Sequence, residues 1–172
     1  NELAATCTAA GVEILTNSTV AGRYEDNWIS ISQRSHPGVI ERLIKARAKT
    51  LVVAAGTIER PYVFQGNDLP GVMTSGAVQR LIRMYGVKPG TRAVVFTANE
   101  SGDSAVEALQ SAGISIARVV DARSGEGITS ASGSKSRVKR VTLSDGTTVE
   151  CDLLVTAVGS VSYTHLTLPT KA

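Results

Sequence analysis

The chain has 172 residues, of which 42% are hydrophobic and 16 are glycine, and its formal net charge is +3 at pH 7. This length suits one complete α/β domain or parts of two. The Lys and Arg residues are scattered, which excludes the basic face that nucleic-acid binding requires. No apolar run reaches the roughly 20 residues of a membrane-spanning helix. We therefore expect a cytoplasmic protein without nucleic-acid or membrane partners.

Both ends of the chain look unlike those of a natural protein. The opening "NELAATCTAA" predicts a helix that would follow an earlier strand, so we expect the start of the first domain to be missing. At the other end, residues 161–172, "VSYTHLTLPTKA", resemble the translation of an adapter used in sequencing libraries. We therefore expect this segment not to be native and not to contribute to the fold or the function. An ordinary polar C-terminus is the alternative.

The first part of the chain is predicted to alternate helix and strand. Residues 1–10 form a helix that leads through Gly11 into a strand, "VEIL". Three short runs separated by the turn sequences "EDN" and "SHPG" then predict an antiparallel meander. The three runs cover residues 19–24, 28–33 and 40–48. The continuous apolar run "KTLVVAAG" predicts a strand that is buried on both faces.

The second part repeats this order of elements. The stretch from Thr57 to Gly90 carries one helix, "SGAVQRLIRMYG", among Pro and Gly residues, and so has the character of a connector. After it we predict a strand, a helix, a strand, a hairpin around "SDG" and a last apolar strand. These elements, the hairpin apart, cover residues 92–97, 102–112, 115–120 and 152–158. Helix, strand, meander and an apolar strand ending in glycine thus occur twice.

The motif "VVAAGTIERP" has the features of a nucleotide-contacting strand end. A strand that ends in Ala-Ala-Gly places small residues where the backbone passes close under a bound adenosine, and Pro61 then turns the chain away. The alternative is a tight strand-to-loop turn without a ligand.

The turn "TANESG" stands where a nucleotide-binding fold carries its glycine-rich phosphate loop. Aligned with G-x-G-x-x-G, it has Thr97 and Asn99 in place of the first two glycines and keeps the third as Gly102. The third glycine lets the helix pack against the strand, whereas Asn99 carries a side chain into the space of the pyrophosphate. Glu100 and Asp103 add negative charge at the helix N-terminus. We expect this second nucleotide site to be empty.

Few other side chains indicate chemistry. Asp121 ends the next strand, where an acidic residue can bind a ribose, but without phosphate contacts we favour an ordinary turn residue. His36 lies in a Pro-Gly turn, which indicates a surface position. Cys7 and Cys151 lie far apart and outside any C-x-x-C motif, so we expect buried thiols. No Ser/His/Asp set, metal cluster or carboxylate pair is recognisable, and the catalytic residues stay unknown.

The order of elements resembles the two-dinucleotide-binding-domain flavoproteins, the glutathione and thioredoxin reductase superfamily, in which one nucleotide domain is inserted into another. The segments "ERPYVF", "GNDLPGVM" and "YGVKPG" together resemble the α subunit of heterotetrameric sarcosine oxidase and the related opine oxidase, amino-acid dehydrogenase and hydrogen cyanide synthase subunits. The resemblance covers most of residues 12–160 and is densest from Leu51 to Ser101.

This resemblance implies an α/β fold of the Rossmann-like FAD/NAD(P)-binding type, with a partial first domain and an inserted second nucleotide-binding-like domain. The expected segments are 1–71 for the C-terminal part of the first domain, 72–89 for a connector, 90–160 for the second domain and 161–172 for the adapter-like tail. The resemblance also implies that the strand end and the start of the meander contact FAD or NAD in the first domain. The contacting residues would be Val20, Ala54, Ala55, Gly56 and Thr57.

The function implied by the resemblance is that of a flavin- or NAD-dependent oxidoreductase subunit. It would work with a flavin-bearing β subunit, as a hetero-oligomer, on a secondary amine or amino acid, and the present fragment would be inactive alone. One alternative is a stand-alone NAD(P)H-dependent flavoprotein reductase, against which the altered phosphate loop counts. The other is a non-catalytic scaffold subunit with a vestigial nucleotide site.

Overall fold

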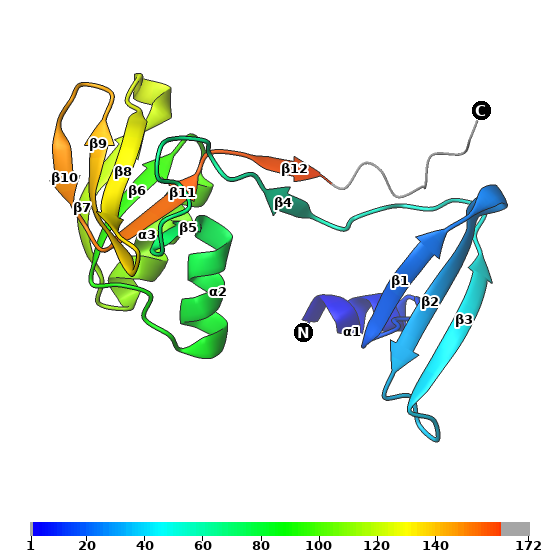
Figure 1. Cartoon of the computed structure of the whole chain (residues 1–172). Helices are drawn as coiled ribbons and strands as arrows, with labels where there is room; N and C mark the ends of the chain where they lie inside the picture. Colours follow the sequence, from blue (N-terminus) through cyan, green and yellow to red (C-terminus); the bar gives the residue numbers. More distant parts are fainter. Residues whose placement is uncertain (1, 163–172) are drawn as a thin grey trace. The chain divides into compact units, whose positions relative to one another are not determined.

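The computed structural model describes residues 2–162 and divides them into two compact units (Figure 1). The first unit ends at Gly56, and the second comprises Thr57–Ser162.

The first unit contains one helix and a small antiparallel sheet. Its elements are helix α1 (Glu2–Ala9) and strands β1 (Ser18–Arg23), β2 (Trp28–Arg34) and β3 (Glu41–Arg47), with a short 3₁₀ turn, η1 (Glu25–Asn27), between the first two strands. The strands pair in the order β1-β2-β3, each antiparallel to its neighbour. The predicted helix and meander are confirmed.

Two strands that the sequence predicts in this unit do not form. Residues 12–15 and 51–56 are irregular and pair with no strand in residues 2–162. Val52 is 84% exposed, so the prediction of a strand buried on both faces was wrong. The physical reason is that a buried central strand needs a neighbour to receive its backbone hydrogen bonds and layers to cover its side chains, and the described residues supply neither.

The second unit is built around a four-stranded parallel sheet of order β5-β11-β6-β7. A three-stranded antiparallel sheet, β10-β9-β8, and a two-stranded ribbon, β4–β12, complete it. The elements in chain order are β4 (Thr57–Glu59), β5 (Val72–Thr74), α2 (Ser75–Tyr85), β6 (Arg92–Thr97), α3 (Ser101–Ser111), β7 (Ser115–Asp121), the 3₁₀ turn η2 (Ala122–Ser124), β8 (Ile128–Ser134), β9 (Arg137–Leu143), β10 (Thr148–Glu150), β11 (Leu153–Ala157) and β12 (Ser160–Ser162).

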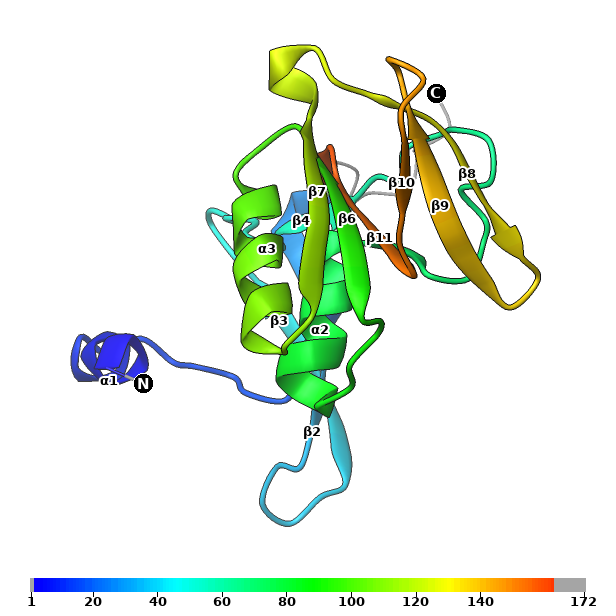
Figure 2. The ribbon, with the colours of Figure 1, turned by 90° about the vertical axis from the view of Figure 1, so that its left-hand side faces the viewer.

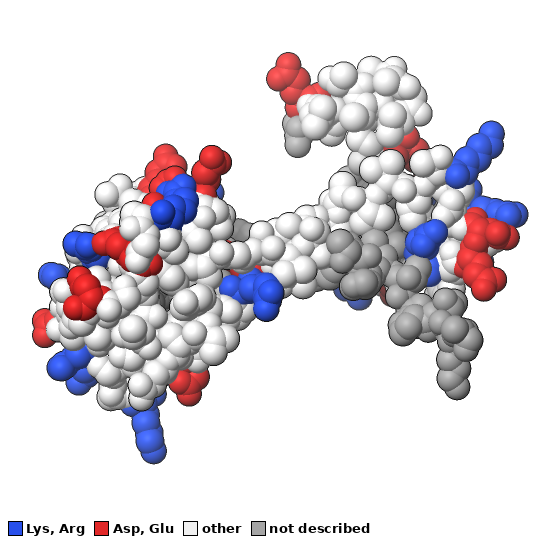
Figure 3. Space-filling model, turned by 90° about the horizontal axis from the view of Figure 1, so that it is seen from above, with Lys and Arg blue, Asp and Glu red and all other residues white. Residues whose placement is uncertain are grey.

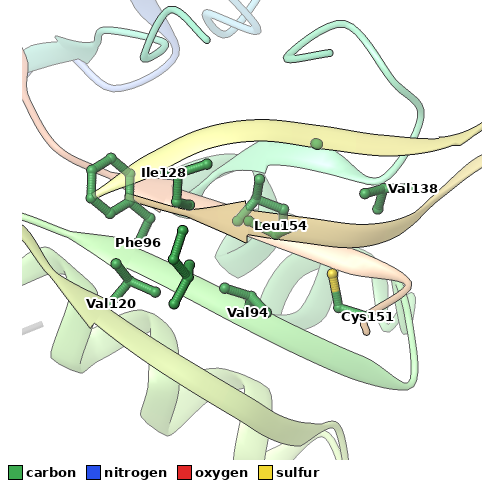
Figure 4. Close-up of a cluster of buried hydrophobic side chains, with 10 residues drawn as sticks. Val94, Phe96, Val120, Ile128, Val138, Cys151 and Leu154 are labelled. Carbon is green, nitrogen blue, oxygen red and sulfur yellow. The ribbon is translucent and has the colours of Figure 1, made fainter. Parts of the chain in front are cut away.

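Three layers make up this unit (Figure 2). Alternate residues of β6 point to opposite faces of the parallel sheet, as in any strand. Ala93 and Val95 pack with α2 and α3 on one face. Val94 and Phe96 pack with the antiparallel sheet on the other face, in the cluster drawn in Figure 4. The continuous apolar sequence of β6 is therefore explained by burial on both sides.

Glycines end both helices of the second unit, as their sequences predict. Gly86 follows α2 with a φ of +62° and donates its N–H to Leu81 O. Gly113 lies two residues beyond α3 with a φ of +69°. Residues with a side chain rarely adopt this left-handed conformation, which explains glycine at both positions.

The two cysteines have different environments. Cys151 is buried in the cluster of Figure 4, as predicted, and burial raises the pKa of its thiol to about 11. The thiol therefore stays protonated near neutral pH and is a poor nucleophile. Cys7 is only partly buried, on α1, so the prediction of a buried thiol was wrong there.

The compact second unit includes residues that the sequence analysis assigned to the first domain and to the connector. Strand β5 pairs with β11, and Phe64 and Leu69 pack against the core. At the other end, Val161 of the adapter-like tail pairs with Ile58 in the β4–β12 ribbon. The rest of that tail, residues 163–172, lies outside the described residues. The predicted domain limits stay predictions.

The surface shows basic and acidic side chains close to one another. On the face of the second unit seen in Figure 3, Lys and Arg residues alternate with Asp and Glu residues. Among the described residues, no helix combines the length and the apolar character needed to cross a membrane.

Candidate dinucleotide sites

The five residues predicted to contact a cofactor are divided between the two units. Val20 lies in β1, 59% exposed, and is paired with Ile31 of β2. Ala54, Ala55 and Gly56 are exposed in the irregular segment that ends the first unit. Thr57 begins β4 in the second unit. Their cofactor contacts stay predictions.

Gly56 combines a left-handed backbone with open space. Its φ is +76°, and a Cβ added at this position would meet no atom within 4 Å. The backbone conformation alone favours glycine here. The open space is also what a backbone needs if a ligand is to lie against it. A test of the predicted contact must therefore separate the conformational requirement from the steric one.

The β6–α3 turn keeps the close packing that the third glycine of a phosphate loop provides. Thr97, at the end of β6, is only 1% exposed. A Cβ added to Gly102 would lie 2.2 Å from Thr97 Oγ1 and 2.4 Å from Thr97 Cβ. Only glycine at 102 therefore lets α3 begin so close to the strand.

Three N–H groups of this turn are hydrogen-bonded within the turn itself. Asn99 N donates to Thr97 Oγ1 at 3.2 Å, and Ser101 N donates to Asn99 Oδ1 at 2.9 Å. Gly102 N donates to Asn99 O at 3.1 Å. A phosphate loop uses such N–H groups to bind the anion. Here their hydrogen bonds are accepted by Asn99 and Thr97 instead.

Asn99 therefore caps the N–H of Ser101, the first residue of α3, from one position before Glu100, whose own side chain makes no capping hydrogen bond. From the sequence, this side chain was predicted only to obstruct a pyrophosphate, and its capping role was missed. The signal was present, because Asn is among the preferred N-cap residues and accepts from an N–H two or three positions later.

Asp121 is already paired. Its Oδ1 accepts from Arg123 Nε at 2.9 Å and its Oδ2 from Arg123 Nη2 at 2.7 Å. Hydrogen bonds from the Arg123 side chain and backbone hold the pKa of the Asp121 carboxyl below its ordinary value. A ribose hydroxyl would have to compete with this pair, which favours the turn-residue interpretation. Sequence reasoning did not single out Arg123.

The charges around Arg123 disfavour a phosphate. The carboxylates of Asp121, Asp103 and Glu100 all stabilise the charged form of Arg123 and so raise its pKa. They also neutralise the cation that would otherwise attract an anion to the start of α3. Charge and hydrogen bonding at this turn therefore both disfavour the binding of a phosphate.

The described residues show few other candidates for chemistry. They contain no group of three or more His, Cys, Asp or Glu residues able to hold a metal ion. The ring of His36 lies beside its own turn, with Nδ1 2.9 Å from Pro37 O.

Solved structures identify the fold of this chain. The chain is similar to L-proline dehydrogenase from P. horikoshii (TM-score 0.62, 21% identity, 83% of this chain and 27% of that chain). It is also similar to an NAD-dependent persulfide reductase from A. fulgidus (TM-score 0.63, 16% identity, 95% and 34%). A third is an FAD-dependent pyridine nucleotide-disulphide oxidoreductase from Desulfovibrio vulgaris (TM-score 0.56, 18% identity, 87% and 45%). The chain thus has the Rossmann-like fold of FAD/NAD(P)-binding oxidoreductases, as predicted.

Relatives of known name identify the family to which the chain belongs. The chain is 35% identical over 125 residues to sarcosine oxidase subunit alpha of Rhizobium meliloti (strain 1021), covering 68% of this chain and 13% of the relative. It is 40% identical over 118 residues to sarcosine oxidase subunit alpha of Corynebacterium sp. (strain P-1), covering 63% and 12%. No protein-family model matches the chain. The chain is therefore a homologue of one segment of the sarcosine oxidase alpha subunits, and it spans about an eighth of their length.

Proposed function

We propose that this chain is part of a cytoplasmic oxidoreductase subunit that supports the oxidation of a secondary amine or an amino acid. The observation that carries this proposal is the 35–40% identity to sarcosine oxidase alpha subunits over about two thirds of the chain. Sarcosine is both a secondary amine and an amino acid, so the substrate class follows from the name of these relatives. The cofactor supplies the redox chemistry, and the protein binds and orients it.

Val20 and the residues around the end of the first unit contribute one wall of the FAD or NAD site in this proposal. Val20 and the segment Ala54–Thr57 present small or exposed residues, and Gly56 leaves open space beside its backbone. These features suit a ligand that lies against the main chain. The cofactor is either FAD or NAD, because both occur among proteins with this fold.

The second unit has lost its nucleotide ligand in this proposal. Asn99 and Thr97 accept hydrogen bonds from the N–H groups that would bind a phosphate. Glu100 and Asp103 add negative charge at the start of α3. This arrangement counts against a stand-alone NAD(P)H-dependent reductase, which would need a working nicotinamide nucleotide site. The altered turn instead suits a subunit of a hetero-oligomer that works with a flavin-bearing β subunit, either by passing electrons to it or by positioning it.

The activity of the full-length protein with its partners tests the proposal. Purified together, they should reduce an artificial dye when sarcosine or another secondary amine is added, and should not oxidise NADPH at a comparable rate. Amine-dependent reduction is measured spectrophotometrically. NAD(P)H oxidation without amine oxidation would support the reductase alternative, and the absence of both activities would support a scaffold role.

The empty second site gives a separate prediction. The unit Thr57–Ser162, expressed alone, should show no measurable affinity for NAD(H) or NADP(H) in calorimetry. Glu100→Gln removes one repulsive charge, and Asn99→Gly frees the backbone approach. Neither change alone should restore tight binding, because a dinucleotide needs both a close approach and a helix N-terminus without competing carboxylates.

Both changes combined with Thr97→Gly rebuild the glycine pattern and should allow weak binding. Each variant is compared with the unmodified unit at the same salt concentration, because charge effects are screened by salt. Micromolar binding by the unmodified unit would contradict the prediction and would make Asp121 a ribose ligand.

A further inference from the structure

The N-terminus of α2 receives its cap from a distant strand. Thr74, at the N-cap position, makes no side-chain capping hydrogen bond, and the first turn contains no acidic residue. Instead, Glu59 of β4 accepts from Gly76 N, at 2.9 Å to Oε1 and 2.8 Å to Oε2. The hydroxyl of Ser75 donates to Glu59 Oε1 at 2.5 Å. A carboxylate placed here also interacts favourably with the helix dipole.

The contact leaves little freedom to Glu59. Ser75 is 1% exposed, so its hydroxyl is held within the fold. A Cβ added to Gly76 would lie 2.6 Å from Glu59 Oε2, so glycine at this position leaves room for the carboxylate. The residue types at 75 and 76 thus match a carboxylate that arrives from β4.

The side chain of Glu59 is also the main contact between its own strand, β4, and the rest of the second unit. Neither β4 nor β12 contributes a residue to the two buried clusters. Ile58 and Val161, which face each other in the ribbon, are 53% and 47% exposed. The ribbon is held by its own strand pairing, by the hydrogen bond from Arg60 N to Gly159 O, and by the Glu59 side chain.

The strand that Glu59 fixes is continuous with the predicted cofactor contacts. Thr57 lies two residues before Glu59 in β4, and Gly56 comes immediately before the strand. We propose that Glu59 is a positioning residue, whose contact with Ser75 and Gly76 fixes the place where Thr57 meets the bound FAD or NAD. This inference rests on the proposed cofactor site, and Glu59 itself need not touch the cofactor.

Cofactor affinity of the full-length protein tests this role. FAD and NAD⁺ are titrated separately into the apoprotein, and thermal stability is measured on the same samples. Glu59→Ala should raise the Kd of the bound dinucleotide about tenfold. Glu59→Gln keeps one acceptor oxygen and should give a smaller rise. Ser75→Ala removes one donor, leaves the carboxylate in place, and should raise the Kd two- to threefold.

Asn99→Ala is the matched control. It removes the cap of α3 in the same unit without touching β4, so it should lower thermal stability to a similar extent and leave the Kd within twofold of the wild-type value. A merely structural cap would give the same result for Glu59→Ala as for Asn99→Ala, and that result would overturn the inference. If Glu59→Ala does not fold, an unchanged Kd in Glu59→Gln and Ser75→Ala would overturn it equally.

The same titrations separate the inference from the proposed function. If Gly56→Val weakens binding while the Glu59 and Ser75 variants bind normally, only the positioning role fails. If the wild-type protein binds neither FAD nor NAD⁺, or if Gly56→Val has no effect, the cofactor site fails and the positioning role fails with it.

Discussion

Replacing Gly56 by valine should reduce the dinucleotide content of the full-length protein at least tenfold, which corresponds to about 1.4 kcal/mol or more of binding free energy. The branched side chain would enter the space in which the adenosine is proposed to lie, a space that no atom of the chain occupies within 4 Å of the Cβ position. Bound cofactor is released by acid denaturation and quantified by chromatography.

Backbone strain is the competing explanation for such a loss, since Gly56 has a φ of +76°. Gly11→Val is the matched control. Gly11 has a φ of +81°, also has no atom within 4 Å of its Cβ position, and lies outside the predicted site. Both variants should lose similar stability, because a β-branched residue is strained in the left-handed region. Equal cofactor content in the two variants would show that Gly56 makes no cofactor contact.

Gly102→Ala should destabilise the second unit by about 3 kcal/mol, at the upper end of the range for overpacked cores. The new methyl group would lie 2.2 Å from Thr97 Oγ1 and 2.4 Å from Thr97 Cβ. A Cβ cannot rotate away, so either the start of α3 or the end of β6 must move. The loss is measured by urea unfolding followed by far-UV circular dichroism.

A second substitution at the strand end checks the cause. Adding Thr97→Gly removes the atoms that clash and should recover at least about 1 kcal/mol of the loss, as expected for residues in direct contact. Gly127→Ala serves as control, because a Cβ there would make only ordinary contact, 3.6 Å from Ser144 Cβ. A Gly102→Ala variant as stable as Gly127→Ala, or no recovery in the double variant, would contradict the assigned packing.

The local elements of this fold were predictable because their signals are local. The turn sequences on either side of β2 identified the meander, and Gly86 and Gly113 marked where the helices end. The strand β6 was predictable from its apolar sequence because both of its faces are buried. The same reasoning failed for residues 49–56, whose apolar sequence is equally continuous. A strand also needs partners, and its own sequence does not say whether they are present.

The contacts that define the candidate sites were only partly predictable. The loss of the glycine pattern was visible in "TANESG", and the capping role of Asn99 could have been recognised from its residue type. The pair of Asp121 with Arg123 was also local in sequence but was missed. The contact between Glu59 and Ser75 has no local signal, because 15 residues of intervening chain separate the two positions and only the folded unit brings them together.

The β4–β12 ribbon has a consequence for how this protein can evolve. Glu59 and Ser160, near the two ends of the second unit, are cross-strand partners, so the chain enters and leaves the unit at a separation of about 5 Å, which a tight hairpin turn can close. Recombination can therefore remove the unit as a cassette, or exchange it for another, without stretching the surrounding polypeptide. If the second site is empty, as proposed, a cassette of this kind can change its own site while the rest of the protein keeps an independent ligand.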